Sequence, residues 1–204
     1  MSGGEDDAPA RPEVGRVEAF SDGVIAIIVT IMVLELHPPE EAGWDRLWHL
    51  WPTFLAYVLS YAYVALYWAN HHRLFSHATR VTNGLIWSNM LLLFTLSLVP
   101  FATAYLGDQH FSRPAMWVYL GVLMLSSLAW PWLQATIRTH GRRDETARLY
   151  HRRTTRKGWF ATAVYLLGMA LTFVSPWLGA AAAALVAIFW FLPTSRIDRL
   201  FARD

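Results

Sequence analysis

The polar residues within an apolar stretch near the start of the chain are the first candidates for chemistry. Residues 16–36 read RVEAFSDGVIAIIVTIMVLEL and carry Glu18, Asp22 and Glu35. At a rise of about 1.5 Å per residue, this stretch is long enough to cross a membrane as a helix. A carboxylate at bilayer depth costs roughly 2.5 kcal/mol or more, so the helix is expected to face protein or water over part of its circumference. A polar helix enclosed by more apolar ones is typical of a pore or transport pathway.

One side of this helix has the spacing of a contact face. At about 100° per residue, the i, i+3, i+4, i+7 pattern of such a face is occupied by Phe20, Gly23 or Val24, Ile27, Thr30 or Ile31, and Leu34. The stripe is apolar except for Thr30. Asp22 falls roughly opposite, so we expect it to pair with polar groups on other helices rather than with a passing ion. Periodicity alone leaves two interpretations open, a packing seam and a pore lining.

Partners for Asp22 are available near the inner ends of the next two apolar stretches. They are Trp68, Asn70, His71, His72, Trp87 and Asn89, and Arg16 stands just before the first helix. Buried charges in membranes are normally paired. The sequence therefore predicts a polar network that joins Arg16, Asp22, histidine and asparagine.

Enzymatic and metal chemistry are poorly supported. His71 and His72 are adjacent, so on a helix they point about 100° apart and rarely share one ion. The chain has no cysteine and no HExxH motif. Ser21 and Asp22 are sequence neighbours, which gives no triad geometry. We expect hydrogen-bonding histidines, no metal site, no cofactor and no enzyme activity.

The composition predicts an all-α membrane protein. Apolar residues make up 55% of the 204-residue chain and charged residues 16%, which is too apolar for an ordinary soluble domain. Four long runs lack Asp, Glu, Lys and Arg, namely residues 47–72, 81–107, 114–137 and 158–195. The last run is interrupted by Ser175-Pro176, and proline is a poor helix-interior residue, so two spans are expected there. Together with the opening stretch, this gives six transmembrane helices.

The expected boundaries follow from these runs. We predict helices at residues 17–36, 48–69, 81–106, 115–137, 158–174 and 177–192, with a basic, partly helical loop at 138–157. Residues 1–15 are polar and are expected to be a disordered cytoplasmic tail. Residues 16–195 form the six-helix transmembrane domain, and residues 196–204 form a cytoplasmic C-terminal tail.

The basic residues predict the orientation. With the N-terminus inside, all 17 Lys and Arg residues except Arg46 and Arg113 fall on the inner side. The positive-inside rule then places both termini in the cytoplasm of a multi-pass plasma-membrane protein. Basic inner loops need no nucleic-acid partner, and no cleavable signal peptide is expected.

The first motif also resembles a known signature. The pattern RxxxFSDGVxAIxxT from Arg16 to Thr30, followed by YWxxHHxxF at 67–75, WxN at 87–89 and Pro100-Phe101, resembles the bacterial relatives of the lysosomal potassium channel transmembrane protein 175. The resemblance covers residues 16–192. It implies homotetramers with one six-helix repeat per chain, in which four copies of the first helix line a central pore. The TVGYG filter of ordinary potassium channels is absent from the sequence.

The resemblance also implies roles for single residues. Ile27 matches the narrowest ring of the pore, Ile31 and Leu34 match further apolar layers toward the outer side, and Thr30 matches a threonine implicated in selectivity. An inner network that supports the first helix and subunit assembly is matched by Arg16, Phe20, Ser21, Asp22, His71, His72 and Asn89.

The expected function is therefore a potassium-permeable cation channel with an apolar constriction, which acts on potassium and other monovalent cations in a lipid bilayer. An isoleucine ring offers an ion no oxygen to replace its hydration water, so potassium is favoured over sodium only modestly. The alternative is a proton-coupled secondary transporter in which Asp22 and the histidines relay protons. Transporters usually show paired repeats with broken midplane helices, and this pattern is not evident in the sequence.

Overall fold

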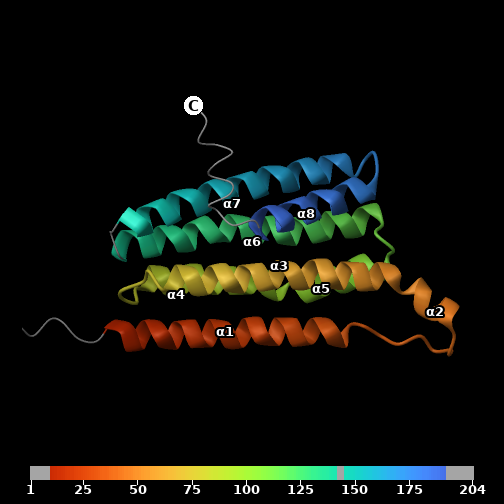
Figure 1. Cartoon of the computed structure of the whole chain (residues 1–204), viewed down its shortest axis with the longest axis horizontal. Helices are drawn as coiled ribbons and strands as arrows, with labels where there is room; N and C mark the ends of the chain where they lie inside the picture. Colours follow the sequence, from red (N-terminus) through yellow and green to blue (C-terminus); the bar gives the residue numbers. More distant parts are fainter. Residues whose placement is uncertain (1–9, 142–144, 192–204) are drawn as a thin grey trace, which may run out of the picture.

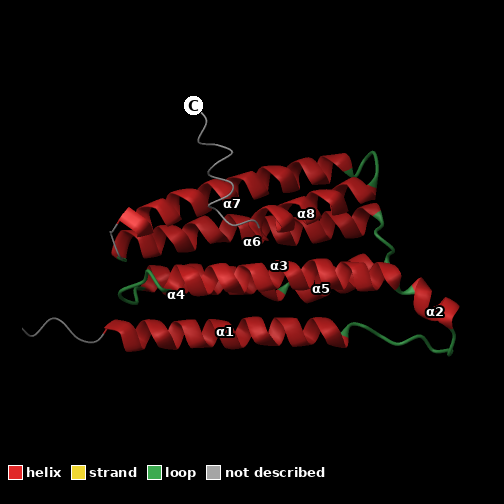
Figure 2. Cartoon of the chain, in the orientation of Figure 1, coloured by secondary structure: helices red, strands yellow, loops and turns green. Residues whose placement is uncertain are grey.

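The computed structural model describes residues 10–141 and 145–191, and this part of the chain is helical apart from short turns (Figure 2). The all-α prediction is confirmed. The described residues form eight helices: α1 (Ala10–Leu34), α2 (Trp44–His49), α3 (Trp51–Phe75), α4 (Asn83–Ser97), α5 (Val99–Asp108), α6 (Arg113–His140), α7 (Glu145–Leu171) and α8 (Pro176–Phe191).

The long helices run side by side in layers (Figure 1). α1 lies along one side and packs on α3, α4 and α5. On the other side of this middle layer, α6 packs against α4 and α5, and α7 and α8 complete the outer layer. α1 is therefore the one long helix that forms a layer of its own among the described residues.

Hydrogen bonds between side chains join the layers inside the apolar core. The hydroxyl oxygens of Thr103 on α5 and Ser60 on α3 are 2.7 Å apart, and Ser60 also donates to the hydroxyl of Tyr119 on α6 at 3.0 Å. All three residues are buried. The hydroxyls satisfy one another where water is excluded, as buried polar groups must.

The first helix differs from its expected boundaries at both ends. α1 begins at Ala10, so residues 10–15 are helical and do not belong to a disordered tail. Pro12 lies in the first turn, where its missing N–H is not needed, and Glu13 complements the positive end of the helix. The helix ends at Leu34, before the Pro38-Pro39 pair. Residues 1–9 and the predicted C-terminal tail lie outside the described residues.

The third predicted helix is interrupted. α4 ends at Ser97 and α5 starts at Val99, with Leu98 between them. Pro100 has no N–H to donate to the preceding turn, which explains the break. The second predicted helix is longer than expected, since α3 continues to Phe75 and the short α2 precedes it.

The basic, partly helical loop predicted at residues 138–157 is more helical than expected. α6 continues to His140 and α7 already begins at Glu145, so most of this segment extends two helices. Arginine has a high helix propensity, and the segment contains no proline that would stop a helix. The basic residues of this segment thus lie largely on the C-terminal end of α6 and the N-terminal part of α7.

Three helical stretches of the described residues are long enough and apolar enough to cross a membrane. They are Pro12–Leu34, Asn83–Asp108 (which contains the break at Leu98) and Arg113–His140, and α8 is a shorter apolar helix. α3 is rich in tyrosine and carries His71, His72 and Arg73 near its C-terminal end at Phe75, and the first half of α7 is charged. Three stretches therefore meet these criteria, and the count of six spans stays a prediction.

Candidate functional site

The predicted stripe on α1 is uncovered in the single chain. The exposed fractions are 58% for Ile27, 40% for Ile31 and 73% for Leu34, whereas Ile28 and Met32 are exposed by only 3% and 1%. The buried residues face α3, α4 and α5, and the exposed ones point away from the subunit core. α1 thus has two apolar faces, and its own chain covers only one of them.

Thr30 lies within the exposed face. Its hydroxyl donates to the backbone carbonyl of Ile27 at 2.9 Å. This bond uses the only hydroxyl proton, so both lone pairs of the oxygen remain able to accept or to solvate a cation.

A buried chain of hydrogen-bonded polar side chains contacts the N-terminal half of α1. Asn89 on α4 donates from its amide nitrogen to the Ser21 hydroxyl at 2.8 Å and accepts from Nε2 of His71 on α3 at 2.9 Å. Ser21 in turn donates to the carbonyl of Val17 at 2.8 Å, and the His71 ring stacks on Phe75. Ser21, His71 and Asn89 are fully buried. One amide side chain thereby bridges α1 and α3.

Asp22 and Glu18 form a second set of contacts between α1 and α3. The Trp68 indole N–H donates to the Asp22 carboxylate at 3.0 Å. One helical turn away, Nδ1 of His72 lies 2.8 Å from a carboxylate oxygen of Glu18. Both carboxylates are half-buried. Two pairs with i, i+4 spacing thus meet in register along the two helices.

Most of the predicted network residues meet in these two groups. The structure brings Ser21, His71 and Asn89 together, and it places Asp22 and His72 in the neighbouring group. Within the described chain, Arg16 forms no ion pair and Phe20 is exposed. Their predicted roles in assembly therefore stay predictions.

The sequence reasoning missed Glu18 as a contact residue. The spacing of four residues in the sequence indicates this contact. Glu18 and Asp22 have i, i+4 spacing on one helix, and Trp68 and His72 have the same spacing on another. Two such pairs on apolar helices indicate that the helices face each other along these sides.

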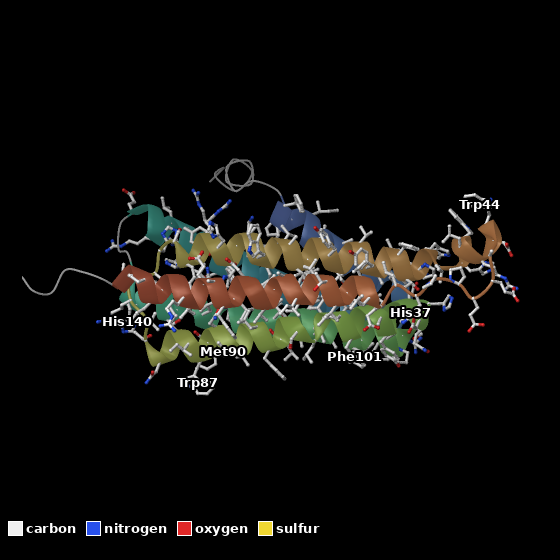
Figure 3. The ribbon with its side chains drawn as sticks, turned by 90° about the horizontal axis from the view of Figure 1, so that it is seen from below. His37, Trp44, Trp87, Met90, Phe101 and His140 are labelled. Atoms are coloured by element: carbon white, nitrogen blue, oxygen red, sulfur yellow. The ribbon has the colours of Figure 1, made fainter. Side chains whose placement is uncertain are left out.

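A groove runs beside the exposed face toward the C-terminal end of α1. Ile27, Ile31 and Glu35 line it from the α1 side, and Ser97, Pro100, Phe101 and Ala104 line it from the α4 and α5 side. Figure 3 shows Trp87, Met90 and Phe101 projecting from the same side of the molecule, next to α1. The exposed fractions of Trp87 and Phe101 are 68% and 65%. The uncovered apolar surface therefore extends from α1 onto α4 and α5.

The charged N-terminal half of α7 carries a buried histidine. His151 is 3% exposed, and neither ring nitrogen has a hydrogen-bond partner. Burial, together with the neighbouring His77 and Arg138, lowers the pKa of His151 to about 4. Burial also raises the pKa of Tyr150, whose ring lies against both histidines.

The described residues contain no group of three or more His, Asp or Glu side chains arranged to hold a metal ion. The geometry of the candidate site is therefore an apolar, exposed helix face with one hydroxyl, held from behind by buried hydrogen bonds.

Known proteins resemble this chain in sequence and in fold. A family described as the endosomal/lysosomal potassium channel TMEM175 matches residues 16–100. A protein named a potassium channel, from Chryseobacterium sp. (strain P1-3), is 41% identical over 186 residues, which cover 91% of this chain and 96% of its own length. The crystal structure of a lysosomal potassium-selective channel TMEM175 homolog from Chamaesiphon minutus gives a TM-score of 0.80 at 33% identity, covering 88% of this chain and 97% of that chain.

The eukaryotic relatives match over a shorter stretch. The rat protein named endosomal/lysosomal proton channel TMEM175 is 36% identical over 118 residues, which cover 52% of this chain and 23% of its own length. The bacterial matches, by contrast, extend over nearly the whole of both chains. The chain is therefore a member of the TMEM175 family of ion channels. It is a multi-pass membrane protein and not an enzyme.

Proposed function

We propose that this protein is a homotetrameric, potassium-permeable cation channel whose pore is lined by α1. The observation that carries the proposal is the uncovered face of Ile27, Ile31 and Leu34 on a helix whose opposite face is buried. An apolar helix surface that the rest of the described chain does not cover is expected to contact another subunit or to line a pore. The relatives named as potassium channels support a pore.

The constriction is the Ile27 ring. Four isoleucine side chains give an ion no oxygen ligand, so passage requires partial loss of hydration water, and the ring can close by dewetting. Potassium loses water more readily than sodium, which gives modest selectivity. The Thr30 hydroxyls, with their lone pairs free, solvate an ion next to the ring.

Four copies are needed because one α1 stripe cannot enclose a pore. The uncovered surface of α4 and α5, with Trp87 and Phe101, offers the side on which the neighbouring copy packs. The inner residues Arg16 and Phe20 face the same assembly. Both termini lie in the cytoplasm, six helices span the plasma membrane, and the basic ends of α6 and α7 lie inside.

The transporter alternative differs in its use of Asp22. In the channel, the Asp22 carboxylate is a structural acceptor for Trp68 and lies off the α1 stripe. No coupled proton is then required for cation flux. A transporter, by contrast, would tie each transported cation to protonation of Asp22 or of a histidine.

The deciding experiment is purified protein in a planar bilayer under a potassium gradient. The channel gives currents that reverse close to the potassium equilibrium potential and do not depend on a proton gradient. Flux coupled to protons with fixed stoichiometry would reject the channel. Native mass measurement in mild detergent should give a tetramer, and a monomer that conducts ions would reject the shared pore.

A further inference from the structure

Glu35 occupies an electrostatically unfavourable position at the outer end of α1. It directly follows Leu34, the last residue of the helix, and no basic residue stands in the last turn. The carbonyl end of a helix carries a partial negative charge, which disfavours a carboxylate there. Glu35 is half-buried and lines the same groove as Ile27 and Ile31. The carboxylate therefore lies along the proposed pore face, near its outer end.

No cation of the described chain neutralises this carboxylate. Arg46 pairs with Glu41 at 2.8 Å, and Arg113 donates to the backbone carbonyls of Thr172 and Phe173. His37 donates from Nδ1 to the backbone carbonyl of Glu35, at 3.0 Å, and not to its carboxylate. An uncompensated carboxylate beside a helix C-terminus leaves a negative potential at this point.

We propose that the Glu35 carboxylates of four copies form a ring at the outer mouth that attracts and holds hydrated cations. This inference rests on the proposed tetrameric channel, because each copy contributes one carboxylate. The four helix C-termini add about half a negative charge each to the same region. The ring raises the local concentration of monovalent cations, and divalent cations, which favour carboxylate oxygens, compete for it.

The test compares Glu35→Gln with the native protein at two salt concentrations. At about 20 mM KCl, screening extends over roughly 20 Å, and the native inward single-channel conductance should exceed that of Glu35→Gln by about twofold or more. At about 1 M KCl, screening is complete within roughly 3 Å and the two conductances should converge. Glu35→Lys should lower the low-salt conductance further. External Mg²⁺ should reduce the native inward current and affect Glu35→Gln less.

Glu40→Gln is the matched control, because Glu40 is an exposed outer-loop carboxylate that does not line the groove. It should change the low-salt conductance much less than Glu35→Gln does, and it should leave the high-salt conductance unchanged. Equal conductance of native protein and Glu35→Gln at low salt, with both assembled as tetramers, overturns the ring and leaves the channel intact. A native tetramer that passes no current overturns the proposed function itself.

Discussion

The indole of Trp68 on α3 donates a hydrogen bond to the carboxylate of Asp22 on α1 at 3.0 Å. This bond ties the exposed helix to the middle layer from its rear face. Because the carboxylate is an acceptor here, we expect Asp22 to hold α1 in position. Loss of the bond should therefore affect folding and assembly before it affects ion passage.

Asp22→Ala should lower the free energy of unfolding by about 1.5 kcal/mol and reduce the yield of tetramer, because a hydrogen bond to a charged group is lost. Thermal unfolding and size-exclusion chromatography in detergent measure both effects. Trp68→Phe removes the other partner, and the double variant should cost less than the sum of the single ones. Additive costs would contradict the contact. Normal assembly of Asp22→Ala with loss of proton coupling alone would favour the transporter.

Asn89 is expected to be the most sensitive member of the buried polar chain. Asn89→Ala leaves the Ser21 hydroxyl and His71 Nε2 without their partner in a dry environment, and should cost about 2–3 kcal/mol. Ser21→Ala should cost less, since Asn89 keeps its bond to His71. Chemical denaturation of the two variants gives the order, and a larger cost for Ser21→Ala would contradict this assignment.

Ile27 substitutions should change permeation. Ile27→Asn places four amides where four apolar groups stood, so hydration of the ring becomes favourable, conductance rises about twofold or more, and potassium-over-sodium discrimination falls. Ile27→Ala should act in the same direction but more weakly, through the radius alone. Single-channel recording measures both.

Val29 is the control for Ile27. It is half-buried and packs against the hydrophobic core. Val29→Ala should lower stability and leave conductance and selectivity unchanged. If the α1 stripe is only a packing seam, the order reverses, with Ile27 variants failing to assemble and single channels unaffected.

Gly107 lies where α5 approaches α3 closely. A Cβ at this position would come within 2.8 Å of the Thr53 Cα, so Gly107→Ala should cost about 1–3 kcal/mol through displacement of the backbone. Gly121→Ala is the control, because a Cβ there meets nothing within 4 Å and alanine favours the helix by about 1 kcal/mol. The melting temperatures of the two variants should therefore move in opposite directions. Similar shifts for both would contradict the close packing of α3 and α5.

His151 makes stability depend on pH. Its folded pKa of about 4 lies below the ordinary value of 6.5, so the unfolded chain binds the proton more readily. The stabilising contribution is fully present above pH 6.5 and is lost as the pH falls toward 4, to a total of up to about 3 kcal/mol. His151→Phe should flatten the pH dependence of the melting temperature over this interval. The exposed His140 is the control, and an equal effect of His140→Phe would contradict the assignment.

The sequence predicted the helices but not all of their ends. Charge-free runs located the apolar cores of the long helices, because burial in lipid or protein excludes unpaired charges. The break at Leu98 was not predicted, because the charge-free run of residues 81–107 continues through Pro100 and gives no sign of two helices. The C-terminal extension of α6 and the N-terminal extension of α7 were not predicted. The many basic residues there indicated a partly helical loop, although arginine is a good helix former.

The sequence predicts those parts of the candidate site that depend on a single helix. The α1 stripe follows from helical periodicity, and the structure leaves that face uncovered. The pairing of Asp22 with Trp68 and of Asn89 with Ser21 depends on how α1 rotates against α3 and α4. That rotation is set by packing between segments 46 and 68 residues apart. The repeated i, i+4 spacing indicates which sides of α1 and α3 face each other, but no comparable spacing in the sequence indicates the contact of Asn89 with Ser21.

The layers are also contiguous along the chain, and this has a consequence for synthesis. α1 to α5 are complete before α6 emerges, so the half that carries the Ile27 face is made first. At that stage Ser88 on α4 still lacks Thr136 on α6, its partner at 3.1 Å. A ribosome stalled after α5 would thus hold an intermediate in which the Ser88 hydroxyl bonds only to the Leu85 carbonyl of its own helix, and in which the α1 face is still unassembled.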